Sequence, residues 1–151
     1  MTKKEKAQKL FLSGYNCAQS VFASFCEETC LDEKTALRLS SPFGGGMGRM
    51  REVCGAVSGM LMVLGMLYGY DETDRYKNKK ELYEKVQLLA NKFSKEHGSI
   101  ICREILNLNE THSDPTPEKR TNEYYSKRKS CIDTVGYAAQ IMEEFIKNNS
   151  N

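Results

Sequence analysis

The residues of this chain best suited to chemistry are its six cysteines: Cys17, Cys26, Cys30, Cys54, Cys102 and Cys131. Their spacing matches no zinc finger, no Cys-x-x-Cys redox pair and no ferredoxin run. Cys17, Cys54 and Cys102 each fall in the first turn of a predicted helix. The free N–H groups and the dipole at a helix start stabilise a thiolate. We therefore expect these three thiols to be the reactive ones.

The other three cysteines have a plainer context. Cys131 lies inside the last predicted helix, where it lacks the help of a helix start and should react more slowly. Cys26 and Cys30 lie near the end of an amphipathic helix, four positions apart and so on one face. Cysteine is a small, often buried hydrophobe. We interpret Cys26 and Cys30 as packing residues with no chemical role.

Composition narrows the class of protein. The formal net charge is +2, from 22 basic and 20 acidic residues that are interleaved, which does not favour nucleic-acid binding. The apolar run at Leu10–Leu12 is too short for a signal peptide. The run from Ala56 to Tyr68 is shorter than the roughly 18 residues of a membrane span. We expect a cytoplasmic protein with no membrane span, where reduced thiols serve metal binding or catalysis.

The hydrophobic pattern predicts an all-α fold, because seven segments have helical periodicity and none alternates with the period of a strand. A length of 151 residues favours a single domain, 1–151, built as a bundle of six or seven helices. The expected helices are Thr2–Ser13, Cys17–Cys30, Glu33–Leu39, Val53–Tyr68, Arg75–His97, Ile100–Leu106 and Asn122–Lys147.

The segment Val53–Tyr68 is expected to be the central helix. It is rich in glycine and methionine and almost wholly apolar, whereas every other predicted helix has a charged face. Methionine fills irregular gaps in cores, so we interpret its methionines, with Met47 and Met50, as core residues. Gly55 and Gly59, four positions apart, indicate close packing against another helix.

A glycine-dense loop, Phe43–Arg49, leads into this helix. Three successive glycines permit positive φ angles and a close approach of backbone to another group. The loop is neither a phosphate-binding P-loop nor a dinucleotide-binding fingerprint. Arg49 and Arg51 beside it could bind an anion, but we interpret them as solvated surface residues. His97, near a helix end, and His112, on a loop over 108–121, are both expected to be surface residues, and His97 is kept as a reserve metal ligand because it closely precedes Cys102.

Several of these segments together resemble the C-GCAxxG-C-C family of redox-active proteins. They are Gly14-Tyr-Asn-Cys-Ala-Gln19, Phe43-Gly-Gly-Gly-Met-Gly-Arg49, Cys54-Gly-Ala-Val-Ser-Gly59 and the single cysteines at 102 and 131. The resemblance runs from about Gly14 to Cys131. The family pattern has glycine before its second cysteine, and this chain has Val53 there.

The resemblance implies that Cys17, Cys54, Cys102 and Cys131 converge as redox thiols or metal ligands. The family is similar to the cluster-binding part of split-Soret cytochrome c, which implies a [2Fe–2S] cluster or another thiolate-bound metal. No Cys-x-x-Cys-His is present, so covalent haem is not expected. Groups near the cysteines would donate hydrogen bonds to the sulfurs of such a cluster. Those groups are Asn16, Gly44, Gly45, Gly46 and Gly55.

The functional hypothesis is a small redox or electron-transfer protein, an oxidoreductase or an electron carrier, with an unidentified redox partner. Its four cysteines would hold an iron–sulfur cluster or other metal, or cycle between thiol and disulfide. One alternative is a structural or metal-storage protein with a zinc site and no electron transfer. Another is a thiol oxidoreductase without metal. The Gly- and Met-rich segment makes a homodimer a reasonable expectation.

Overall fold

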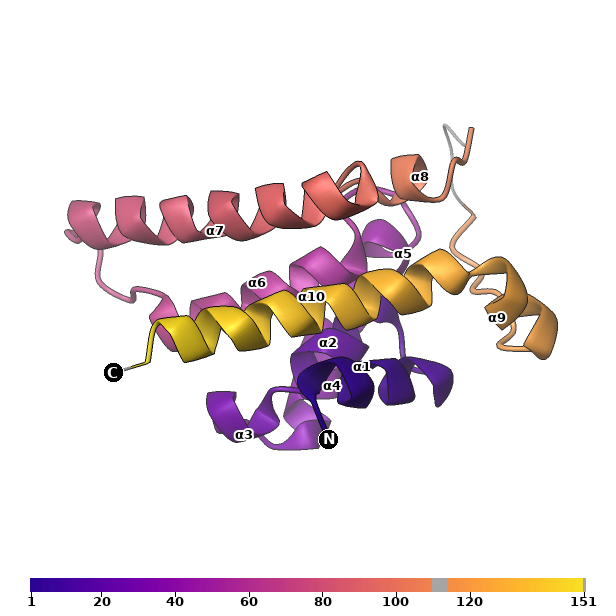
Figure 1. Ribbon diagram of the computed structural model, residues 1–151, viewed down its shortest axis with the longest axis horizontal. Helices are drawn as coiled ribbons and strands as arrows, with labels where there is room; N and C mark the ends of the chain where they lie inside the picture. The colour runs from indigo at the N-terminus through magenta and orange to yellow at the C-terminus, as the bar shows by residue number, and fades with distance from the viewer. Residues whose placement is uncertain (110–113, 151) are drawn as a thin grey trace.

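The computed structural model describes residues 1–109 and 114–150, and this part of the chain is built from helices (Figure 1). His112 lies outside the described residues. Within them, the only β pairing is an isolated antiparallel bridge between Val53 and Ile101. The elements are α1 (Lys3–Leu12), α2 (Cys17–Ala23), α3 (Cys26–Thr29), α4 (Glu33–Ser40), the 3-10 turn η1 (Ser41–Phe43), α5 (Gly44–Met47), α6 (Gly55–Tyr68), α7 (Tyr76–His97), α8 (Cys102–Ile105), α9 (Asn122–Lys127) and α10 (Lys129–Asn148). The predicted all-α fold is confirmed.

Two of the seven expected helices are broken. The segment expected from Cys17 to Cys30 divides into α2 and α3, because Phe25 leaves the helical region and the Ser24 hydroxyl donates to the Val21 carbonyl. The last helix divides into α9 and α10 at Arg128, whose φ of −109° and ψ of 36° are not helical. The second break matters for the site because it makes Cys131 the third residue of a new helix.

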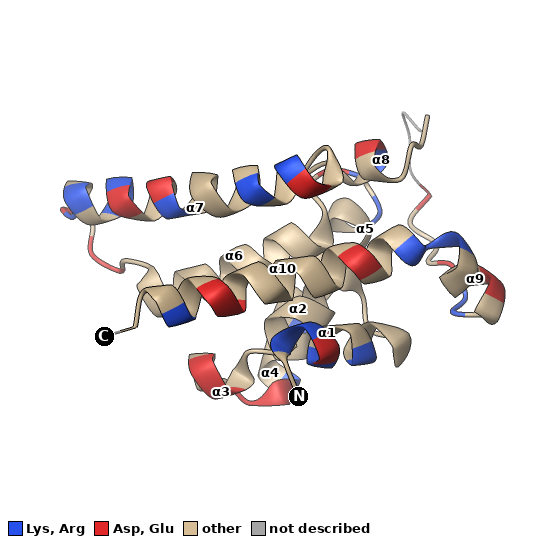
Figure 2. Cartoon of the chain, viewed as in Figure 1, with Lys and Arg blue, Asp and Glu red and all other residues tan. Residues whose placement is uncertain are grey.

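Helix α6 is the central element, as predicted. It packs against α2, α7 and α10, and it carries no charged residue along its length (Figure 2). Ala56, Val57, Met60, Val63 and Leu64 are buried in the core. The burial of so many apolar side chains on one helix is the main reason for its position, since each large one contributes about 1.5–3 kcal/mol when fully buried.

The expectation that the methionines fill the core holds only in part. Met60 is fully buried, but Met47, Met50 and Met66 are exposed. Met47 and Met50 lie on the glycine loop rather than on the helix, and Met66 lies near the C-terminal end of α6, beyond its buried stretch. The number of methionines in this stretch of sequence therefore did not show which of them are buried and which are exposed.

Gly55 and Gly59 bring α6 against the backbone of α2, as their spacing predicted. A Cβ atom at Gly59 would lie 2.7 Å from the Ala18 carbonyl oxygen. One at Gly55 would lie 3.0 Å from the Ala18 nitrogen and 3.1 Å from the Cys17 Cβ. Only glycine allows this approach, which places the starts of α2 and α6 side by side.

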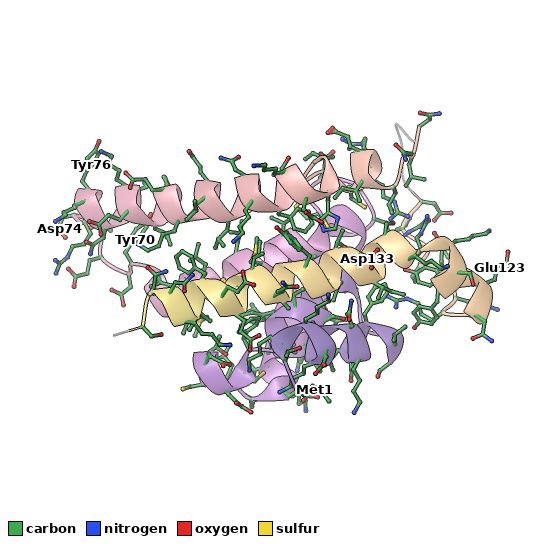
Figure 3. All side chains as sticks on the ribbon, viewed as in Figure 1. Met1, Tyr70, Asp74, Tyr76, Glu123 and Asp133 are labelled. Carbon is green, nitrogen blue, oxygen red and sulfur yellow. The ribbon has the colours of Figure 1, made fainter. Side chains whose placement is uncertain are left out.

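Helix α7 runs along one side of the bundle and is anchored at its C-terminal half by Leu89 and Phe93. Its first residues reach beyond the core: Tyr76 is 82% exposed, and Figure 3 shows Asp74 and Tyr76 at the end of the molecule opposite Glu123 on α9. Within the described residues, none of the helices has the length and apolarity required to cross a membrane.

The glycine packing gives a stability prediction with an internal control. Gly59→Ala should lower the free energy of unfolding by about 1–3 kcal/mol, because the new methyl overlaps the α2 backbone. Gly65→Ala lies on the same helix, and its new methyl would meet no neighbouring atom within 4 Å, so it should raise that free energy by about 0.5–1 kcal/mol. Urea unfolding followed by circular dichroism measures both. Equal effects of the two changes would contradict close α2–α6 packing.

Candidate functional site

Four of the six cysteines line one cavity of about 370 Å³. Each stands at the start of a different helix: Cys17 is the first residue of α2, Cys54 the residue before α6, Cys102 the first of α8 and Cys131 the third of α10. The groups expected around them also line the cavity, namely Asn16, Gly44, Gly45, Gly46 and Gly55. The structure thus brings the predicted site residues together.

Cys17 is positioned by a capping box. The Asn16 side chain accepts a hydrogen bond from the Gln19 backbone N–H at 2.9 Å, and the Gln19 side chain accepts one from the Asn16 N–H at 3.0 Å. The Asn16 amide also donates to the Ser41 carbonyl at 3.0 Å. Gly44 packs directly on this amide, where a Cβ would lie 2.6 Å away. The start of α2 is therefore tied to the glycine loop.

Cys54 and Cys102 are held beside each other by backbone hydrogen bonds. The Cys54 N–H donates to the Ile100 carbonyl at 2.7 Å, and the Cys102 N–H donates to the Glu52 carbonyl at 2.6 Å. Gly46 has a left-handed φ of 67°, and a Cβ there would lie 2.7 Å from that of Cys102. The glycine loop therefore closes over α8 in a way that only glycine allows.

Arginine side chains surround the thiols, which the sequence did not reveal. Arg51 is 5% exposed, and its Nη1 donates to the Cys102 Sγ at 3.7 Å. The expectation that Arg49 and Arg51 are solvated was wrong for Arg51. Both have positive φ angles, 65° and 59°, in the left-handed turn of the glycine loop. Both side chains line the cavity.

Three of the arginines lie near one carboxylate, that of Glu118. The Glu118 Oε1 lies 2.8 Å from Arg128, 3.7 Å from Arg49 and 3.8 Å from Arg51. The Arg49 Nη1 also donates to the carbonyls of Asp114, at 2.6 Å, and of Thr116. These contacts hold the segment from 114 to 118 over the cavity. Arg128 and its neighbouring arginines hold the pKa of Glu118 below its usual value despite partial burial.

The cavity has a positive balance of charge. Of the described residues that line it, four are arginines, Arg49, Arg51, Arg120 and Arg128, and one is acidic, Glu118. Arg120 donates to the carbonyls of Phe11 and Tyr15, both at 3.1 Å, and stacks on the rings of Phe11 and Tyr124. Figure 2 shows basic residues on α9 and at the start of α10, where this wall is formed.

Burial raises the pKa of Cys54 and Cys102, and interaction with Cys131 together with burial raises that of Cys17. Burial raises the pKa of Cys54 to about 12, although backbone N–H groups of α6 oppose the shift. Burial also raises the pKa of Cys102, against the opposing effect of Arg51. The pKa of Cys17 is raised well above its usual value because it donates a hydrogen bond to Cys131 and is buried. The expectation that these three are the activated thiols was wrong.

Cys131 is the exception. Its pKa is lowered by the hydrogen bond that it accepts from Cys17 and by the charges of Arg128, Arg51 and Arg120, which together outweigh its burial. The expectation that Cys131 lacks the help of a helix start was also wrong, because the break at Arg128 places it in the first turn of α10. Of the four cavity thiols, Cys131 alone has a lowered pKa, and Cys17, whose pKa is raised, interacts with it.

The remaining candidates lie elsewhere. Cys26 and Cys30 are on and after α3 and do not line the cavity, in agreement with a packing role for Cys26, while Cys30 is exposed. His97 does not line the cavity either; it packs between the rings of Phe93 and Tyr137. Within residues 1–109 and 114–150, no group of three or more His, Cys, Asp or Glu side chains is arranged to hold a metal ion, and all six cysteines are free thiols.

The thiol assignments predict an order of alkylation. Cys131 should be the fastest of the four cavity thiols at pH 7, and Cys54 the slowest. As pH falls, Cys131 should lose reactivity through a midpoint below that of free glutathione labelled in the same solution, because its lowered pKa keeps the thiolate present at lower pH. Arg128→Gln should move that midpoint upward. Iodoacetamide labelling with peptide mass spectrometry measures each site. A midpoint for Cys131 at or above that of glutathione would contradict the assignment.

Comparison with known proteins agrees with the site. The chain matches, over residues 15–145, the family model described as putative redox-active protein (C_GCAxxG_C_C). The matched range contains all four cysteines of the cavity. No curated protein and no solved structure matches the chain. Because the match takes in most of the sequence, the chain belongs to the C_GCAxxG_C_C family of redox-active proteins.

Proposed function

We propose that this protein is a dithiol redox protein in which Cys131 is the attacking thiolate and Cys17 is the thiol that resolves the intermediate. The proposal is supported by the position of both thiols on one cavity, and by the interaction with Cys17 and the arginine charges, which lower the pKa of Cys131. A reactive thiolate beside a second thiol is the arrangement that thiol–disulfide exchange requires.

The reaction is written for a disulfide as oxidant. The Cys131 thiolate attacks one sulfur of the disulfide, the substrate S–S bond breaks, and the departing thiolate takes up a proton. Cys17 then loses its proton and attacks the Cys131 sulfur, so that the mixed disulfide breaks and the second substrate thiolate leaves and is protonated. The protein gives up two electrons and the Cys17 proton, a second proton comes from water, and the substrate becomes two thiols.

The contact also explains how Cys17 becomes a nucleophile only in the second step. Its pKa is raised chiefly by its hydrogen bond to Cys131 and by burial, with a further contribution from the Cys131 negative charge. Once Cys131 is in a mixed disulfide it carries no charge, so the hydrogen bond to a thiolate and the repulsion are lost. Deprotonation of Cys17 is then easier, in the step that needs its thiolate.

A second function has separate support from the number and kind of donors. Cys17, Cys54, Cys102 and Cys131 line the same cavity, and four cysteine thiolates are the usual ligands of an iron–sulfur cluster. Such a cluster with its ligands is anionic, which suits the arginine-rich wall. A zinc ion, the alternative without electron transfer, would draw on the same four sulfurs and would leave the protein colourless.

Serine variants separate the steps of the dithiol reaction. With a small disulfide as oxidant, Cys17→Ser should trap the mixed disulfide at Cys131, Cys131→Ser should form none in the cavity, and Cys54→Ser should still form the Cys17–Cys131 bond. Intact-mass and disulfide-mapping mass spectrometry give each product. Cys26→Ser is the control on a cysteine outside the cavity. Formation of a Cys54–Cys102 bond in place of Cys17–Cys131 would refute the proposed pair.

The dithiol function does not need Cys54, whereas the cluster function does. If the cavity holds an iron–sulfur cluster, anaerobic reconstitution with iron and sulfide should give a brown protein, and replacing any of the four cysteines by serine should remove the colour. Cys26→Ser should keep it. A visible spectrum with iron and sulfide analysis measures this. A colourless protein with well under one iron and well under one zinc per chain would leave the dithiol function alone.

A further inference from the structure

We propose that the substrate of this thiol pair is a small disulfide that carries a carboxylate, which binds to the arginines that now hold Glu118. The inference rests on the proposed dithiol function and adds the class of molecule that the cavity accepts. It depends on three features: the positive balance of the cavity wall, the carboxylate that already lies on it, and the size of the space beside Cys131.

The first feature is the concentration of guanidinium groups on one side of the cavity. Arg49 and Arg128 come from segments about 80 positions apart in the sequence and meet on one carboxylate oxygen. Guanidinium groups are suited to planar, two-point recognition of a carboxylate. A cleft lined by one sign of charge raises the local concentration and the association rate of oppositely charged molecules by about 10–1,000-fold. An anion is therefore drawn to this wall and a cation is repelled.

The second feature is the internal carboxylate. Glu118 is 37% exposed as a side chain, and its Oε1 contacts Arg128 at 2.8 Å while Arg49 and Arg51 stand almost 1 Å farther away. The Glu118 carboxylate thus lies near three guanidinium groups, of which Arg128 is the nearest. A carboxylate of a bound molecule can occupy the same place with a similar partner set, while the partly exposed Glu118 side chain moves toward solvent.

The third feature is size. A cavity of about 370 Å³ is at the lower end of the range that holds small molecules, roughly 300–1,000 Å³. It suits a compact disulfide and not a folded protein. Cys131 and Arg128 lie within one helical turn of each other and both line the space. A molecule whose carboxylate takes the place of Glu118 at Arg128 therefore lies in the same cavity as Cys131.

The proposal is tested with three disulfides of nearly equal size. They are 3,3′-dithiodipropionate, which is anionic, bis(2-hydroxyethyl) disulfide, which is neutral, and cystamine, which is cationic. Mixed-disulfide formation is followed at each cysteine by quenching and peptide mass spectrometry. Rates at Cys131 are divided by rates at the exposed Cys30 of the same chain, which corrects for the intrinsic reactivity of each reagent.

In the Cys17→Ser variant, which holds the mixed disulfide, the anionic reagent should exceed the neutral one at Cys131 by about tenfold or more after this correction, and the cationic reagent should be slowest. Added salt should shrink the difference. Arg128→Gln should reduce the anionic preference, and Glu118→Gln should increase it, because it removes the competing carboxylate. Arg49→Gln provides a second arginine variant in case Arg128→Gln fails to fold.

The experiment distinguishes failure of the carboxylate site from failure of the dithiol function. If Cys131 reacts with all three reagents at equal corrected rates, the proposed carboxylate site is overturned and the dithiol function stands. If Glu118→Gln lowers the anionic preference, the site is also overturned, since Glu118 then recruits the substrate instead of competing with it. If Cys131 reacts with none of the reagents, the dithiol function fails and the substrate proposal fails with it.

Discussion

The close approach of α6 to α2 is the contact on which the site depends. Gly55 and Gly59 lie against the backbone of Ala18, at distances that leave no room for a side chain. This approach sets the starts of the two helices next to each other, and with them Cys17 and Cys54. The other two cysteines come from the same end of the bundle. Helix α8 is held there because the Cys102 N–H donates to the Glu52 carbonyl and the Cys54 N–H donates to the Ile100 carbonyl, and the break at Arg128 places Cys131 at the start of α10.

Four helix starts at one cavity do not produce four thiolates, because the energies are unequal. A helix dipole contributes about 0.3–1 kcal/mol to a nearby charge, which is less than one pKa unit at about 1.36 kcal/mol each. Burial shifts pKa values by up to about 3–5 units. Burial therefore prevails at Cys54 and Cys102, and only Cys131, with nearby guanidinium charges and a thiol donor, has a lowered pKa.

The sequence was sufficient for most of the fold. Helical periodicity identified the segments, the near absence of polar residues identified α6 as the centre, and the Asn16–Gln19 capping box was readable from residue types alone. The meeting of the four cysteines followed only from the family resemblance, because their spacing in sequence is irregular. The break at Arg128 has no helix-breaking residue to mark it, so the place of Cys131 in a first turn could not be predicted.

The arginine wall could not be predicted for a different reason. Arg49 meets Asp114 and Thr116 across 65 and 67 positions, and Arg51 meets Cys102 across 51. Such contacts depend on how distant loops pack together. Loops have no periodicity that predicts which of their side chains point inward. The left-handed backbone of Arg49 and Arg51 is also unusual for residues other than glycine. The arginines that give the cavity its positive charge were therefore the part of the site that the sequence predicted least well.

The two candidate functions differ chiefly in what they require of Cys54. In the dithiol reaction Cys54 takes no part and remains protonated in its buried position. As a cluster ligand it must lose its proton, although burial raises its pKa to about 12. Cys102 and Cys17 also have raised pKa values, so a bound metal would have to supply the positive charge that favours their thiolates. The arginines reduce the cost of negative charge for both functions, but the dithiol function requires only the one thiolate that they already stabilise.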